Sequence, residues 1–197
     1  MSKFQKFAGK LLLLGLAGLM LGGCSSVKFT NLIGNPADDK TLNAIAIEGL
    51  YTADDATVAI KDLGEGKIAV GLLQWKEDKF EALQFEGEIR QIGNVAIVNL
   101  VQQDKQDGKT YYSIGRIAPS QQGDLVFYNP NIQGFEQAIA DGELDGTVVQ
   151  NDKVVTVTVT STTEQLNTFL TPTRAATMFH VEQPTVLHRV SEKESGD

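Results

Sequence analysis

The stretch Lys67–Trp75 reads KIAVGLLQW, and a second stretch, Val95–Val101, reads VAIVNLV. Side chains along a β-strand alternate between the two faces of its sheet. In both stretches the two alternating sets are apolar, as Val70 and Leu73 illustrate for the first one. A strand that is apolar on both faces needs cover on both. We therefore expect Val70 and Leu73 to be buried alike, in a curved sheet or barrel with helices on part of its outside.

Outward from these stretches, short apolar runs alternate with turn residues such as Gly64-Glu65-Gly66 and Gly93-Asn94. Short connections make hairpins rather than crossovers, so the sheet should be antiparallel. The pattern predicts a mainly β domain over residues 44–190. Its strands should form an antiparallel meander of about 8–10 strands, folded as a curved sheet or small barrel.

Two short helices interrupt the expected meander. One is predicted over Gln133–Ala140, with Phe135 on its apolar face and Gly142 where a helix stop is expected. The other should begin at Ser161-Thr162-Thr163-Glu164, which matches a capping box with Ser161 at the cap. Pro172 follows too closely for one long helix, so we expect a kink or two separate turns.

The composition is that of a globular protein with an acidic surface. The 197 residues are 42% hydrophobic and 21% charged, with a net charge of −8. Residues 1–23 hold three lysines and no acid, so the remainder has 14 bases against 25 acids, a net of −11. Nucleic-acid binding needs a basic surface, so no nucleic-acid partner is expected. Direct attraction to anionic lipid headgroups is disfavoured for the same reason.

The first 23 residues have the features of an export signal. Lysines lie within Met1–Lys10, and the apolar run Leu11–Leu21 is too short to span a bilayer as a helix. Leu21-Gly22-Gly23-Cys24 then resembles the lipobox of bacterial lipoproteins: an apolar residue, two small residues and a cysteine. The resemblance implies cleavage before Cys24 and a diacylglyceryl thioether on its sulfur. Acyl chains on Cys24 would then hold the protein to a membrane.

The lipoprotein resemblance also bears on location and on the segment that follows. In Gram-negative lipoproteins an aspartate after the cysteine favours inner-membrane retention, whereas this chain has Ser25. The resemblance thus implies the periplasmic face of the outer membrane, if the organism is Gram-negative. Residues 24–43 carry the breaker Gly34-Asn35-Pro36 and few apolar residues, which predicts a lipidated tether. Residues 191–197 form a polar tail.

A second resemblance concerns the barrel. Gly49-Leu50-Tyr51, a Gly-rich meander and a late helix before a final strand are similar to lipocalin-type barrels. The family's opening signature is usually Gly-x-Trp, and here Tyr51 takes the place of the tryptophan. The resemblance implies the architecture alone, and an open curved sheet or a sandwich without a cavity is the alternative.

No catalytic motif is present. There is no Gly-x-Ser-x-Gly, no Gly-rich phosphate loop and no His-Glu-x-x-His, so we expect neither an enzyme nor a cofactor. His180 and His188 lack further ligand residues at metal-site spacing, so no metal is expected either. Four aromatic residues are the candidate lining of a ligand pocket, although aromatic residues of a β domain belong to the core more often than to a pocket. They are Trp75, Phe85, Tyr111 and Tyr112.

Two functions remain open. The first is a non-catalytic envelope lipoprotein whose domain binds another envelope protein or supports an assembly. The second is a lipid-anchored barrel that binds a small apolar ligand. A cavity lined by the four aromatic residues would favour the ligand, and a filled barrel with an exposed apolar patch would favour the protein partner.

Overall fold

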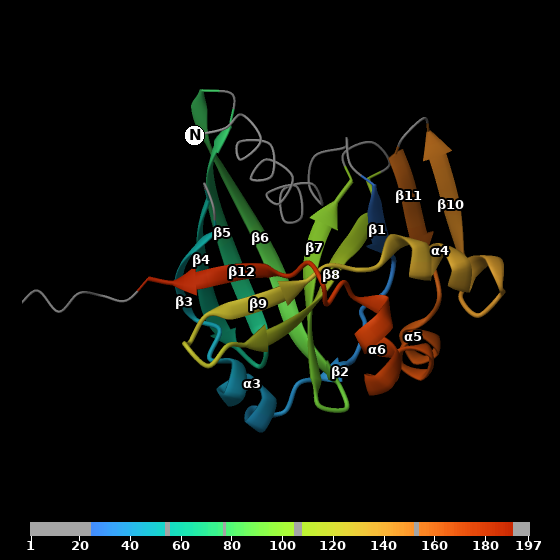
Figure 1. Ribbon diagram of the computed structural model, residues 1–197, viewed down its shortest axis with the longest axis horizontal. Helices are drawn as coiled ribbons and strands as arrows, with labels where there is room; N and C mark the ends of the chain where they lie inside the picture. The colour runs from blue at the N-terminus through green and yellow to red at the C-terminus, as the bar shows by residue number, and fades with distance from the viewer. Residues whose placement is uncertain (1–24, 54–55, 77, 105–107, 152–153, 191–197) are drawn as a thin grey trace, which may run out of the picture.

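Eight strands close into an antiparallel barrel (Figure 1). The computed structural model describes residues 25–53, 56–76, 78–104, 108–151 and 154–190. Seven strands follow one another as antiparallel neighbours: β3 (Gly49–Ala53), β4 (Ala56–Gly64), β5 (Lys67–Lys76), β6 (Lys79–Ile92), β7 (Val95–Gln103), β8 (Thr110–Pro119) and β9 (Leu125–Tyr128). The eighth, β12 (Thr185–Arg189), pairs with β9 on one side and β3 on the other. The predicted mainly β fold with an antiparallel meander is confirmed.

The inside of the barrel forms one hydrophobic core to which every barrel strand contributes. One buried residue from each strand is Tyr51, Val58, Val70, Ile89, Val98, Ile117, Leu125 and Leu187. Gly115 makes room for the ring of Phe127, because a Cβ on this glycine would lie 2.1 Å from the ring's Cζ atom. Side chains therefore fill this part of the interior.

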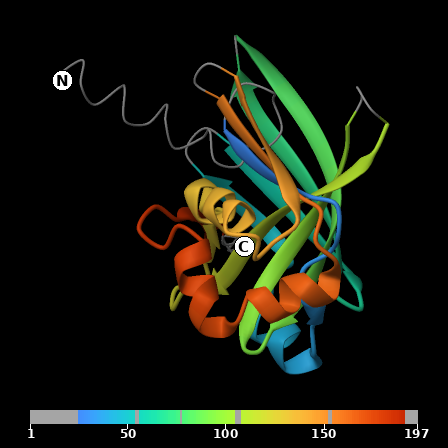
Figure 2. The ribbon, with the colours of Figure 1, turned by 90° about the vertical axis from the view of Figure 1, so that its right-hand side faces the viewer.

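A second core lies outside the barrel. Three strands extend the sheet beyond β8, in the order β1 (Ser26–Phe29), β11 (Val154–Val159) and β10 (Gly146–Asn151). Helices α4 (Ile132–Ala140), α5 (Thr163–Phe169) and α6 (Pro172–Met178) belong to the segment that connects β9 to β12 (Figure 2). They enclose the second core with β1, β7, β8 and β11, through Phe29, Ile97, Ile114, Phe135, Val157, Leu166 and Ala175.

Four helices occur among the described residues, whereas two were predicted. The additional ones have physical reasons in the sequence. Pro172 is the first residue of α6 and separates it from α5. Of the two expected alternatives, a kink or two separate turns, the structure therefore has the second. The capping box of α5 uses Thr162 and Gln165, one residue later than expected. The helix α3 (Asp39–Ile45) is capped by Asp38, whose carboxylate accepts from the Thr41 N–H at 2.8 Å.

The prediction that both faces of Lys67–Trp75 are covered is wrong. Val70 is 6% exposed inside the barrel, but Leu73 on the outer face is 43% exposed. The same prediction holds for Val95–Val101, where Ile97 and Val98 on opposite faces are both buried. The difference arises because helices cover the outer face of β7 and β8, whereas none of the described helices packs over the outer face of β5.

The prediction of a tether over residues 24–43 is wrong for its described part, residues 25–43. Strand β1 pairs in parallel with β11, from Ser26 opposite Thr156 to Phe29 opposite Val159. Val27, Phe29 and Ile33 are buried. The short strand β2 (Asn35–Pro36) then pairs with β6, and α3 follows. The sequence pattern did not predict the pairing of β1 with β11, because β1 is only four residues long and β11 lies far along the chain.

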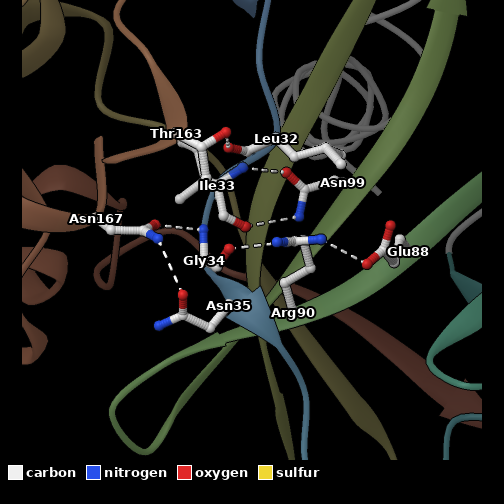
Figure 3. Close-up of polar contacts among 9 residues, drawn as sticks. All are labelled: Leu32, Ile33, Gly34, Asn35, Glu88, Arg90, Asn99, Thr163 and Asn167. Atoms are coloured by element: carbon white, nitrogen blue, oxygen red, sulfur yellow. Dashed lines mark hydrogen bonds and ion pairs between the residues drawn. The ribbon is translucent and has the colours of Figure 1, made fainter. Parts of the chain in front are cut away.

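Polar side chains fix the backbone between β1 and β2 (Figure 3). The fully buried amide of Asn99 accepts from the Ile33 N–H at 2.9 Å and donates to the Ile33 carbonyl at 3.1 Å. Arg90 donates from Nε to the Gly34 carbonyl at 2.8 Å, and Asn167 of α5 accepts from the Gly34 N–H at 2.7 Å. We call these contacts of Asn99, Arg90 and Asn167 the backbone clamp. They satisfy main-chain groups of Ile33 and Gly34, which lie between β1 and β2.

The hairpin of β5 and β6 extends beyond the barrel (Figure 1). Pairing between β6 and β7 ends at Gly87 opposite Leu100, whereas pairing between β5 and β6 continues to Lys76 opposite Lys79. On its other side, β5 remains paired with β4 as far as Gln74 opposite Ala56. We call the end of this hairpin, residues 71–76 and 79–84, the arm. The barrel therefore has two unlike ends, one with the arm and one with α3.

The exposure of β5 leads to a direct test of its two faces. We expect Val70→Ala to lower the free energy of unfolding by about 1–3 kcal/mol, because it removes methyl groups from the barrel core. Leu73→Ala should change it by less than about 0.5 kcal/mol, as at other exposed positions. Urea denaturation of both variants measures the difference, and equal losses would contradict the outward orientation of Leu73.

Candidate functional site

The four aromatic residues predicted to line a pocket do not share one face. Trp75 lies on the outside of the arm, 51% exposed, with its ring 4.7 Å from that of Phe80 in an edge-to-face contact. Tyr112 packs on the second core, outside the barrel. Phe85 packs on the barrel core, and Tyr111, which alternates with Tyr112, is on the same side of the sheet. The structure thus places only Phe85 and Tyr111 on the inner face.

The inner face at the arm end contains polar groups. Phe85 and Leu83 face inward but are only half-buried, so solvent reaches this end of the interior. The buried Gln74 donates to Glu81 Oε2 at 3.0 Å. The Ser113 hydroxyl is buried and has no hydrogen-bond partner among the described residues. Buried hydroxyls ordinarily have a partner, so Ser113 is a group that a bound molecule or a water would satisfy.

Arg189 closes the opposite end, beside α3. Its guanidinium donates to the carbonyls of Ala46, Glu48 and Gly123 at 2.5, 2.8 and 3.1 Å, and to the Tyr51 hydroxyl at 2.5 Å. It also lies over the Tyr51 ring, 4.9 Å from the centroid. Burial raises the pKa of Tyr51, and the nearby Arg189 charge opposes that rise. Arg189 was not among the predicted site residues, because nothing in the local sequence pattern distinguishes it from a solvent-exposed residue at the end of a strand.

A cleft of about 570 Å³ lies next to this closure, between residues 42–48 and residues 119–123. Arg189 forms part of its wall, but the guanidinium is already hydrogen-bonded to protein oxygens. Nearby, the backbone N–H of Arg189 and the ring of His188 both contact Asp124 and lower the pKa of its carboxyl group. The arrangement is a structural closure of the barrel rather than a free anion site.

Arg189→Ala removes the groups that hold three carbonyls at this end. We expect the free energy of unfolding to fall by about 1–2 kcal/mol, a modest loss because solvent can replace part of the hydrogen bonding. Arg189→Lys should recover only part of it, because an ammonium cannot reproduce the planar fork. The exposed Lys67→Ala is the matched control and should be neutral. A neutral Arg189→Ala would contradict a role in closing the barrel.

The outer face of β3, β4 and β5 carries an apolar surface, which Val190 extends directly after β12. Val190 donates its N–H to the Leu50 carbonyl, and Leu50 is followed across the strands by Ala59 and Gly71. Leu73 and Trp75 continue this surface along β5. We call the first part, Val190, Leu50, Ala59, Gly71 and Leu73, the outer row. Its large members Val190, Leu50 and Leu73 are 41%, 45% and 43% exposed.

Other predicted features have the following places. His188 Nδ1 lies 3.0 Å from Asp124 Oδ2, and the backbone N–H of His180 bonds to Asn129. Within the described ranges, no three His, Cys, Asp or Glu side chains are grouped as a metal site would require. None of the helices in the described part of the chain is long and apolar enough to cross a bilayer. Cys24 and the rest of the lipobox lie outside the described residues.

Comparison with known proteins gives no further guide: no family model, curated protein or solved structure matches this chain.

Proposed function

We propose that this chain is a lipid-anchored envelope lipoprotein whose non-catalytic barrel binds a partner protein through the outer row. The anchor rests on Leu21-Gly22-Gly23-Cys24, with acyl chains on Cys24. The residue after the cysteine, Ser25, favours the periplasmic face of the outer membrane in a Gram-negative envelope.

The observation that carries the docking proposal is the outer row. Single exposed apolar residues are normal on protein surfaces, but a group that continues across three strands and the residue after β12 is typical of an interaction site. Three large aliphatic side chains and two small residues share this face, and none of them bears a charge. In a chain with 25 acidic and 17 basic residues, such a face is suited to burial against another protein.

Site-specific photocrosslinking in cells tests this proposal. A photoreactive residue at position 73 of the full-length chain should give a discrete protein adduct in the membrane fraction. The same residue at position 63 is the control, because Leu63 is 58% exposed and lies near the end of β4, four residues from Ala59 of the outer row. Leu50→Asp should abolish the adduct from position 73. Equal adducts from both positions, or none from position 73, would contradict docking at this face.

A second function has its own support at the arm end of the barrel. The half-buried Leu83 and Phe85 face the interior, and the buried Ser113 hydroxyl lacks a partner among the described residues. A small apolar ligand with one polar group would suit this lining. Titration with an environment-sensitive apolar fluorophore tests it: Phe85→Asp should weaken binding about ten-fold or more, and the outward Leu73→Asp should not. Equal effects of the two variants would exclude the interior as the site.

A further inference from the structure

The arm ends in an aromatic pair that no other part of the described structure covers. Trp75 is 51% exposed and Phe80 is 68% exposed, and the two rings meet edge to face. They face each other across β5 and β6, one register pair before Lys76 and Lys79 at the end of the hairpin. The apolar surface of these two rings is removed from water only when a molecule outside the barrel covers it.

The arm and the residue next to the proposed anchor lie at the same end of the molecule. The Ser25 hydroxyl accepts from the N–H of Val155, near the start of β11. Lys28 of β1 forms an ion pair with Asp104, 3.2 Å apart, where β7 leads into β8. In two perpendicular views the arm, the end of β7, the end of β10 and the start of β11 are at one end of the molecule (Figure 1, Figure 2). Acyl chains on Cys24 would bring this end to the membrane.

We infer that Trp75 and Phe80 insert into the interfacial layer of the membrane to which the chain is anchored. The inference rests on the proposed lipidation of Cys24. Tryptophan is enriched at the headgroup level, where an apolar ring and a polar N–H are both accommodated. Lysines such as Lys79 can keep their ammonium groups among the headgroups while their stems lie against apolar surface.

A lipid surface fits this pair better than a protein partner does. Pairing of β6 with β7 ends at Gly87 and pairing of β5 with β4 ends at Gln74, so no other described strand flanks Trp75 and Phe80 to form a groove around them. Contact with a bilayer needs depth and apolar area rather than shape complementarity. The chain's net negative charge predicts that the contact does not depend on anionic lipid.

The sequence provides its own probe, because Trp75 is the single tryptophan of the chain. The full-length lipidated protein is reconstituted into phosphatidylcholine vesicles with and without bromine on the acyl chains near the glycerol. Brominated lipid should reduce Trp75 emission about two-fold, as for a ring at interfacial depth. Phe80→Ser should reduce this quenching while keeping the fluorophore. Leu63→Ser, an exposed leucine at the other end of the barrel, should leave it unchanged.

Flotation of the same vesicles separates the two claims. If the protein floats with the vesicles but Trp75 emission is unaffected by bromine, the inference is overturned and the anchor stands. Emission that remains quenchable by aqueous iodide in the floating protein likewise overturns it, and leaves the aromatic pair to a protein partner. If the wild-type chain does not float and Cys24→Ser behaves identically, the lipid anchor itself fails.

Discussion

Asn99→Leu is expected to lower the free energy of unfolding by about 2–5 kcal/mol, among the largest effects of any polar substitution in this chain. Asn99 is fully buried, and its side chain both accepts from and donates to the backbone of Ile33. Leucine has a similar volume but no polar atoms, so the Ile33 N–H and C=O would remain buried without partners. The desolvation penalty of both groups then adds to the lost hydrogen bonds.

Urea denaturation of Asn99→Leu and of Asn43→Ala gives the comparison. Asn43 lies on the exposed face of α3, where alanine has a higher helix propensity, so this control should be neutral. A second readout is protease susceptibility near residues 30–36, which should rise in Asn99→Leu because the backbone clamp is lost (Figure 3). If Asn99→Leu proves as stable as the wild type, the clamp does not hold the first strand on the barrel.

Gly115→Val should destabilise the barrel by about 3 kcal/mol or more, through overpacking. A Cβ at position 115 would lie 2.1 and 2.4 Å from two ring carbons of Phe127, which is itself in the barrel core. Either the ring or strand β8 must shift, and neighbouring core side chains leave little room for either. The residue is needed for its size, since its backbone φ is not in the left-handed region.

The control for this prediction is another strand glycine. At Gly71 the nearest atom to an added Cβ is the Ala59 carbonyl oxygen at 4.0 Å, so Gly71→Val should be neutral or slightly stabilising. The double variant Phe127→Leu with Gly115→Val should lose less unfolding free energy than the sum of the two single losses, because the smaller side chain relieves the overlap. Thermal denaturation of the four proteins tests this, and strict additivity would contradict a steric origin.

The parts of the fold that local pattern predicts are those with sequence-adjacent partners. Strands β3 to β8 form hairpins with their neighbours, so alternation and turn residues were enough to predict an antiparallel meander in a curved sheet or small barrel. The helices α4 and α5 were also predicted from local signals, namely their N-caps and the spacing of their apolar residues. The closure of the barrel by β12 was harder to predict from the sequence, because a long segment with three helices separates β12 from β9.

What the sequence did not reveal depends on distant partners. The parallel pairing of Ser26–Phe29 with β11 joins residues some 130 positions apart, so residues 25–43 resembled a tether. Leu73 has the same apolar pattern as Ile97, and only the position of the helices decides which of the two is covered. Of the candidate site, aromatic content identified Trp75 and Phe85 but not their opposite orientations. Ser113, Phe80 and Arg189 had no sequence signal at all.

The lipid anchor underlies both the proposed location and the inferred membrane contact, and the mass of the mature N-terminus tests it most directly. Membrane protein from cells that produce the full-length chain is extracted, digested and analysed by mass spectrometry. Our account predicts a terminal peptide that begins at Cys24 and carries a diacylglyceryl group on its sulfur. Cys24→Ser should give an uncleaved chain or a water-soluble product without lipid. An unmodified Cys24 in the wild type, or cleavage at another position, would contradict the account.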